Sequence, residues 1–154
     1  SGYNCAQAVA CTFCEEAGLD DETMRNLMQG FGAGLATMEG NCGAIAGAVA
    51  AAGMINKDQM NTFQDARLIM QQFMEQNGTV ICKELKGIET GHVVRDCDDC
   101  VRDAVRFTEM INSINERRSI RKYQEGNVIS CCFIIREKTN NGEQERNGEL
   151  LWRE

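Results

Sequence analysis

Apolar side chains recur at helical spacing through most of the first 118 residues, and residues 58–76 show the pattern most clearly. Met60, Phe63, Met70 and Phe73 follow one another there at intervals of three and seven. Such spacing places side chains on one face of a helix. The segment therefore predicts an amphipathic helix with these large side chains in the core.

Further helices are indicated by the same spacing and by residues typical of helix ends. Gly18 ends the first of them, and Asp20 or Asp21 is a suitable N-cap for the second. The predicted ranges are 3–17, 20–29, 40–53 and about 97–118. With residues 58–76, this pattern predicts an all-α fold, a helical bundle of about five helices.

The last part of the chain has a different character. Residues 128–135 form an apolar run that is typical of a strand. Asn140-Asn141-Gly142 can form the turn of a short β-hairpin whose second strand is residues 149–152. An irregular tail fits the polar residues between them equally well. We expect residues 1–118 to form one cysteine-containing helical domain. Residues 119–154 would be a C-terminal extension, with a truncated or frameshifted fusion as one explanation.

The predicted helix at 40–53 contains almost no large side chains. Each glycine inside a helix costs about 1 kcal/mol relative to alanine, so Gly43 and Gly47 need a packing or binding reason. They would let a neighbouring helix or a cluster sulfide approach the backbone. Asn41 is a suitable N-cap, which would place Cys42 at the start of this helix. Unpaired N–H groups and the helix dipole favour a thiolate at that position.

Composition narrows the classes of function. The chain has 154 residues, 43% of them apolar, which is enough for one domain with a sizeable core. Its net charge of -7 argues against nonspecific nucleic-acid binding, which depends on neutralising phosphates. No apolar run approaches the roughly 20 residues of a membrane span. We expect a cytoplasmic protein without membrane insertion, although a leader could have been removed before Ser1.

The nine cysteines are the unusual feature of the composition. An odd number cannot pair completely within one chain, and the chain has a core of its own, unlike small disulfide scaffolds. Four lie in small-residue or apolar runs and are interpreted as packed hydrophobes, namely Cys11, Cys14, Cys131 and Cys132. The remaining candidates for chemistry are Cys5, Cys42, Cys82, Cys97 and Cys100.

Cys97 and Cys100 form a C-x-x-C pair with two aspartates between them, whose charge should raise the thiol pKa values. The spacing alone fits redox exchange, zinc binding and iron–sulfur ligation. Val101 stands where a c-type haem site has histidine. His92 is the single histidine, which weakens a zinc site with two histidines and a Ser-His-Asp or Cys-His catalytic site.

Five separate motifs give the chain a resemblance to a known family. In order they are Tyr3-Asn4-Cys5-Ala6-Gln7, Gly30-Phe31-Gly32-Ala33-Gly34, Cys42-Gly43-Ala44-Ile45-Ala46-Gly47, Cys82-Lys83-Glu84-Leu85 and Cys97. Over about residues 2–110 the chain resembles the C_GCAxxG_C_C family of proteins with a suggested redox activity.

The resemblance implies an all-helical redox domain. The family's four cysteines correspond to Cys5, Cys42, Cys82 and Cys97, with Cys100 as an extra or alternative member. The family's relation to split-Soret cytochromes implies an iron–sulfur cluster as the cofactor, whereas the haem-attachment motif is missing.

Residues 115–123 resemble the opening of flavin-dependent nitroreductases, in which arginine and serine side chains hold the FMN phosphate. Nothing after Tyr123 resembles the rest of that fold, so FMN binding is not predicted. The basic residues here also suit the C-terminal end of a helix.

Three functions follow from the sequence. The first is electron transfer through an iron–sulfur cluster or another metal held by the candidate cysteines, with an electron-transfer protein as partner. A homodimer is also expected. The second is thiol–disulfide exchange by a Cys42 thiolate without metal. The third is a non-catalytic helical interaction domain.

Overall fold

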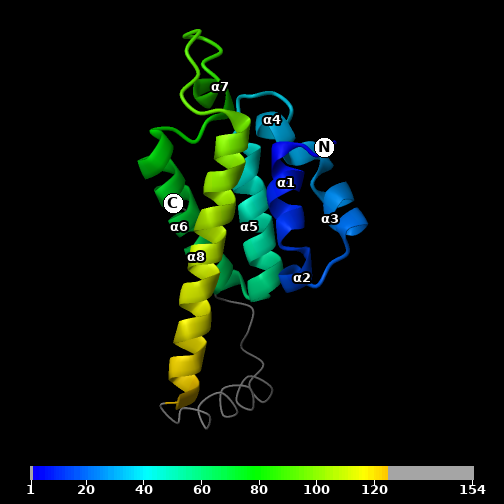
Figure 1. Ribbon diagram of the computed structural model, residues 1–154, viewed down its shortest axis with the longest axis vertical. Helices are drawn as coiled ribbons and strands as arrows, with labels where there is room; N and C mark the ends of the chain where they lie inside the picture. The colour runs from blue at the N-terminus through cyan, green and yellow to red at the C-terminus, as the bar shows by residue number, and fades with distance from the viewer. Residues whose placement is uncertain (1, 125–154) are drawn as a thin grey trace, which may run out of the picture. The chain divides into compact units, whose positions relative to one another are not determined.

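The computed structural model describes the backbone of residues 2–124 and the side chains of residues 2–117. Its regular structure within that range is helical, apart from one isolated bridge between Asn41 and Ile81. The elements are α1 (Cys5–Thr12), α2 (Cys14–Ala17), α3 (Asp21–Leu27), the 3-10 helix η1 (Gln29–Phe31), α4 (Gly32–Leu35), α5 (Gly43–Asn56), α6 (Gln59–Asn77), α7 (Cys82–Leu85) and α8 (Cys97–Gln124) (Figure 1). The all-α prediction is confirmed for these residues.

The chain divides into two compact units, Ser1–Ser113 and Ile114–Glu154. The first unit contains α1 to α7 and the first part of α8. The strand and hairpin predicted for residues 128–152 lie outside the described residues. Among the residues that are described, no helix combines the length and apolar character needed to cross a bilayer.

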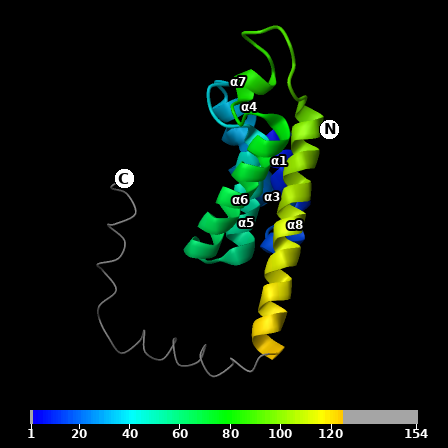
Figure 2. The same cartoon turned by 90° about the vertical axis from the view of Figure 1, so that its left-hand side faces the viewer.

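Helix α5 lies at the centre of the first unit, with α1 on one side and α6 and α8 on the other (Figures 1 and 2). Its small side chains allow this close packing. At Gly47 an added Cβ would overlap the backbone carbonyl of Ala6 in α1. Gly47 therefore has a packing role between two helices, which offsets its cost in helix propensity.

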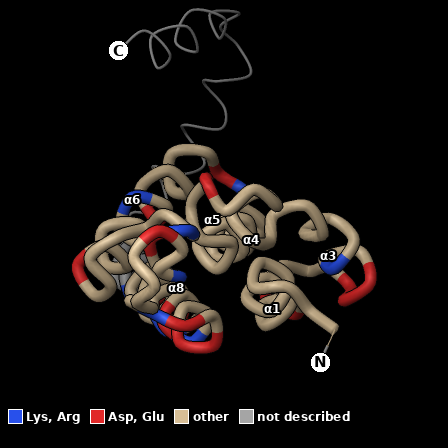
Figure 3. The backbone as a smooth tube through the Cα atoms, turned by 90° about the horizontal axis from the view of Figure 1, so that it is seen from above, with Lys and Arg blue, Asp and Glu red and all other residues tan. Residues whose placement is uncertain are grey.

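One end of this bundle concentrates the helix starts. Both ribbon views place α4 and α7 there, beside the points at which α1, α5 and α8 begin (Figures 1 and 2). Viewed from above, the charged residues lie mainly on the outer segments, and neither α4 nor α5 contains any (Figure 3). The first residues of α1, α5 and α8 thus meet at this end of the unit, where α7 and the first turn of α8 contribute charged side chains such as Lys83 and Asp99.

Helix α6 begins and ends as the sequence predicts, but a different face is buried. Asp58 caps it by accepting a hydrogen bond from the Asn61 N–H at 2.8 Å. The buried residues are Asp65, Ile69, Phe73 and Asn77, four residues apart. Met60 is 58% exposed and Phe63 is 44% exposed, so the predicted core face is wrong apart from Phe73 and the partly buried Met70.

A polar contact accounts for that difference. The side-chain amide of Asn56, at the end of α5, donates to Asp65 Oδ2 at 2.8 Å. This bond allows a carboxylate to occupy the buried face, because a buried polar group that is hydrogen-bonded avoids most of its desolvation cost. Apolar spacing alone could not reveal which face carries that contact.

Other helix boundaries also differ from the predictions. The predicted helix at 3–17 is interrupted at Phe13, whose buried side chain and φ of -108° separate α1 from α2. Asn41 is not the N-cap of α5, because its backbone pairs with Ile81 and Cys42 takes the cap position. The helix that begins at Cys97 continues to Gln124.

Candidate functional site

The first turn of α1 is fixed by a reciprocal cap. Asn4 Oδ1 accepts from the Gln7 N–H and Gln7 Oε1 accepts from the Asn4 N–H, both at 2.9 Å. The two amide groups also donate outward, from Asn4 Nδ2 to the Gln29 carbonyl at 3.0 Å and from Gln7 Nε2 to the Arg25 carbonyl at 2.8 Å. The cap thus ties α1 to the segment of α3 and η1 and fixes the position of Cys5, the first residue of α1.

Cys5 lies against the first residue of α5. A Cβ added to Gly43 would stand 2.6 Å from Cys5 Sγ, 2.7 Å from the Phe31 carbonyl oxygen and 3.2 Å from Gly32 Cα. Gly32 is equally crowded, since a Cβ there would lie 2.7 Å from Asn4 Cγ. These glycines allow three backbone segments to converge on one thiol.

Cys42 and Cys82 flank the isolated bridge between Asn41 and Ile81, each one residue beyond it in the chain. The Cys42 N–H donates to the Val80 carbonyl at 2.7 Å, and the Cys82 N–H donates to the Gly40 carbonyl at 3.0 Å. Gly34, with φ of 57°, lets the preceding loop approach, because a Cβ there would stand 2.9 Å from Cys82 Cβ. Cys82 is the first residue of α7, as Cys5 is of α1.

The last two candidate cysteines come from the first turn of α8. The side chain of Asp96 caps this turn by accepting from the Asp99 N–H at 2.7 Å. Cys100 is buried and its thiol is hydrogen-bonded to Cys42. Cys97 is exposed and is hydrogen-bonded to the ammonium group of Lys86.

Electrostatic interactions join all five of these cysteines. Cys82 interacts with Cys42, Cys5 and Cys97, while Cys100 interacts with Cys42 and Cys97. Each of the five candidates thus lies within electrostatic range of at least one other, although no three of their sulfurs lie within 4.8 Å of one another. We call this group the five-cysteine cluster, namely Cys5, Cys42, Cys82, Cys97 and Cys100.

Among the cysteines of the cluster whose pKa is shifted, Cys42 is the thiol that ionises most readily. The hydrogen bond from Cys100 is the largest cause that lowers the pKa of Cys42, to about 7, and the backbone N–H groups of Ala44 and Ile45 and the charge of Lys86 add to it. Burial acts in the opposite direction. The sequence predicts a lowered pKa for Cys42 from its place at the start of a helix, but the helix start supplies only part of the lowering.

The same contacts also shift the pKa values of Cys100, Cys82 and Lys86. The pKa of Cys100 is raised strongly by its hydrogen bond to Cys42 and by burial, not by the adjacent aspartates to which the sequence analysis attributes it. Burial, followed by the charges of Cys42 and Cys5, raises the pKa of Cys82. Burial would lower the pKa of Lys86, but its hydrogen bond to Cys97 and the neighbouring thiolates raise it. Lys86, which sequence analysis did not identify, is thus the cation of the cluster.

The sulfurs of the five-cysteine cluster are not arranged for a single small metal ion. A tetrahedral zinc site with Zn–S bonds of about 2.3 Å places its thiolate sulfurs about 3.8 Å apart. Within the part of the chain that the structure describes, one group of three ligand atoms lies within 4.8 Å of one another, and it consists of Cys11, Cys14 and Asp21. The five-cysteine cluster is therefore more widely spaced.

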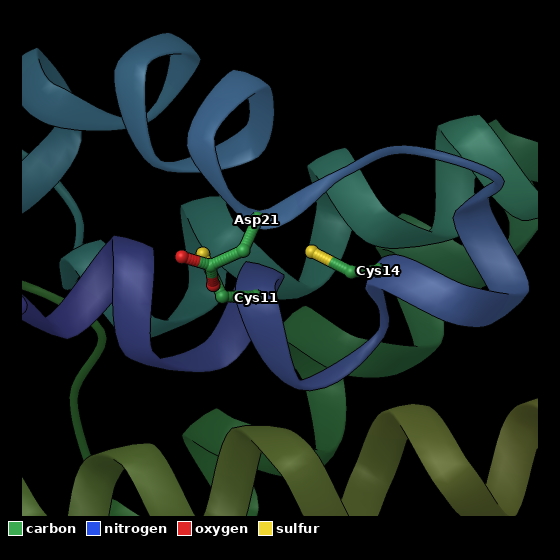
Figure 4. A group of neighbouring side chains, drawn as sticks. All are labelled: Cys11, Cys14 and Asp21. Atoms are coloured by element: carbon green, nitrogen blue, oxygen red, sulfur yellow. The ribbon is translucent and has the colours of Figure 1, made fainter.

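The sequence indicated that Cys11 and Cys14, the two thiols of this compact group, are only packed hydrophobes. The break at Phe13 ends α1 after Cys11 and starts α2 at Cys14, and the Cys14 side chain points toward Cys11 and Asp21 (Figure 4). Both cysteines pack against the smaller core cluster from half-buried positions. Burial, together with the charge of Asp21, raises the pKa of Cys11 to about 12. The C-x-x-C spacing of Cys11 and Cys14 was the feature of the sequence that could have indicated this group.

Comparison with protein families gives one match. A family model described as "Putative redox-active protein (C_GCAxxG_C_C)" matches residues 3–111. Comparison with curated proteins and with solved structures gave no match. The resemblance of residues 115–123 to nitroreductases finds no support in these comparisons, and those residues lie beyond the matched range.

Proposed function

We propose that this chain, which belongs to the C_GCAxxG_C_C family, is a redox protein that carries electrons on an iron–sulfur cluster. The ligands would be Cys5, Cys42, Cys82 and Cys97, with Cys100 as an alternative ligand. Bound there, the iron–sulfur cluster would accept one electron from a reduced donor and pass it to an oxidised acceptor. The observation that carries the proposal is the approach of these cysteines to one another from four separate segments.

The donor set suits this cofactor. Iron–sulfur clusters are held by cysteine thiolates, and the iron and sulfide between the ligands keep the sulfurs farther apart than one zinc ion would. No three sulfurs of the five-cysteine cluster lie within 4.8 Å of one another, which argues against a mononuclear site and supports the larger cofactor. Gly43 contributes by leaving Cys5 room beside the start of α5.

The electrostatics support the same cofactor. Cys5, Cys82 and Cys97 are the first residues of α1, α7 and α8, and Cys42 caps α5. Helix starts carry partial positive charge and unpaired N–H groups, which stabilise thiolates and an anionic cofactor. The ammonium group of Lys86 adds a full positive charge.

We also propose that the electron partner is a protein that docks beside the cluster, with a second copy of this chain as the alternative. The loop after α7 exposes Ile88, Val93 and Val94, each by more than half of its side chain. Backbone bonds from Val94 and Arg95 to the Leu85 carbonyl hold that loop against α7, next to Cys82 and Lys86. A reducing compartment such as the cytoplasm would keep the thiols available.

A metal-free alternative is favoured by one specific contact. Cys42 and Cys100 are hydrogen-bonded as a thiolate and a thiol, which is the pairing needed for disulfide formation. Forming the S–S bond would transfer two electrons and the one proton of the pair to an oxidised partner disulfide, which would become one thiol and one thiolate. In a non-catalytic interaction domain neither reaction would occur.

Iron and acid-labile sulfide per chain, measured after anaerobic purification, distinguish these functions. We expect a coloured protein with equal iron and sulfide, and loss of both in Cys42→Ser and Cys82→Ser. Cys14→Ser is the matched control and should keep the colour. A colourless protein in which Cys42 and Cys100 form a disulfide reversibly would instead establish the metal-free alternative. Colourless protein with unreactive thiols would leave only the interaction domain.

A further inference from the structure

We propose that Cys11, Cys14 and Asp21 form a second site, which binds one thiophilic divalent cation of the zinc type. Their ligand atoms all lie within 4.8 Å of one another. Bonds of about 2.3 Å to sulfur and 2.0–2.2 Å to oxygen would place tetrahedral ligands about 3.5–3.8 Å apart. Small rotations of these side chains would close the remaining distance.

Three segments build this site, which makes it more than a local C-x-x-C spacing. Cys11 lies near the end of α1, Cys14 begins α2 and Asp21 begins α3. The buried side chain of Phe13 fixes the break between the first two. Gly18, in the left-handed conformation with φ of 69°, then reverses the chain and returns Asp21 to the two thiols (Figure 4).

A neighbouring tyrosine orients the carboxylate. Tyr3 Oη donates a hydrogen bond to Asp21 Oδ2 at 2.7 Å, and the Arg25 guanidinium lies 5.0 Å from the Tyr3 ring centre. Ligating carboxylates are commonly held in this way by an outer hydrogen bond. Asp21 Oδ1 remains available to the cation, so Tyr3 acts as a positioning residue.

The donor types select the class of cation. Two thiolates favour zinc and similar soft or borderline ions, whereas magnesium and calcium require oxygen ligands. Cys11 and Cys14 are half-buried and Asp21 is exposed, so a water molecule can reach the fourth position. When zinc binds, the two thiols release their protons to solvent as the two Zn–S bonds form.

Site-resolved alkylation of the full-length chain tests this proposal. The protein is kept reduced with a phosphine, incubated with zinc or magnesium chloride, and labelled with a maleimide, and the rate at each cysteine is measured by mass spectrometry. We expect zinc, but not magnesium, to slow labelling of Cys11 and Cys14 together. Because each cysteine is read separately, zinc at the five-cysteine cluster cannot be mistaken for zinc here.

Two variants test the roles of the oxygen groups. Asp21→Asn should raise the zinc concentration needed for protection by at least about tenfold, and Tyr3→Phe by roughly tenfold. Glu22→Gln removes the same charge from the next residue of α3 and should leave protection unchanged. Circular dichroism confirms folding of each variant. The proposal is overturned if zinc protects neither Cys11 nor Cys14, or if Asp21→Asn and Glu22→Gln behave alike.

Discussion

Gly43→Ala tests the role of Cys5 most sharply, because the added methyl group points at its sulfur. The new Cβ would stand 2.6 Å from Cys5 Sγ, whereas ordinary contact begins at 3.4 Å, so the sulfur must move by about 0.8 Å. Binding sites hold their ligands to within about 0.5 Å of the productive geometry. We therefore expect Gly43→Ala to lose most of its iron and sulfide.

The stability of the same variant should also fall, because the new Cβ would lie 2.7 Å from the backbone carbonyl oxygen of Phe31. Overpacking costs about 1–3 kcal/mol, and replacing glycine by alanine in a helix returns up to about 1 kcal/mol. We expect a net loss of about 1–2 kcal/mol in the free energy of unfolding, measured by denaturant titration of the metal-free protein.

Gly53→Ala in the same helix is the matched control. Its Cβ would meet Thr62 Cγ2 at 3.5 Å, which is ordinary contact, so the variant should keep its iron and gain up to about 1 kcal/mol. If folded Gly43→Ala retains wild-type iron and sulfide, Cys5 is not a ligand in the geometry described.

Four further predictions concern single residues and their contacts. In the reduced, metal-free protein, the ultraviolet absorbance of thiolates should rise in a step near pH 7 as Cys42 ionises. This step should move to higher pH in Cys100→Ala, because Cys42 loses the hydrogen bond from Cys100. A step that stays at the same pH would contradict this prediction. The stability that the Cys42 thiolate contributes should be complete above its unfolded pKa of 9.0 and fall as pH drops to about 7, as urea titrations across that range would show. Lys86→Met should make the reduction potential of the bound iron–sulfur cluster more negative, because it removes a positive charge that favours the reduced state; a potential equal to that of the wild type would place Lys86 away from the cofactor. Asn4→Ala should lower the free energy of unfolding by about 1–2 kcal/mol through loss of the helix cap, whereas Asn26→Ala, on exposed α3, should have little effect.

Helices with strong local signals were predictable from the sequence. Gly18 was expected to end the first helical segment and does so at α2, and Asp20, one of two candidate caps, caps α3, because a cap depends on neighbours in the chain. The buried face of α6 was not predictable in this way. It depends on the bond between Asn56 and Asp65, which forms only after two helices have packed.

The candidate site was likewise predictable from the sequence only in part. The sequence placed Cys42 at the start of a helix and left it among five candidate cysteines, four of which match the family's cysteines. Lys86 carried no motif, and its contact with Cys97 arises from the approach of α7 to α8. Cys11 and Cys14 pack against the core as the sequence indicated, but their closeness to Asp21 was not predictable, because the break at Phe13 depends on a buried side chain rather than on a glycine or proline.

X-ray absorption at the iron edge, on anaerobically purified protein, tests the central claim most directly. The proposed cofactor predicts iron surrounded by sulfur alone, with a second shell of scattering from a neighbouring iron. Cys42→Ser should lose that second shell together with its iron. Iron with only oxygen or nitrogen neighbours, and no iron–iron scattering in the wild-type protein, would contradict an iron–sulfur cluster at these cysteines.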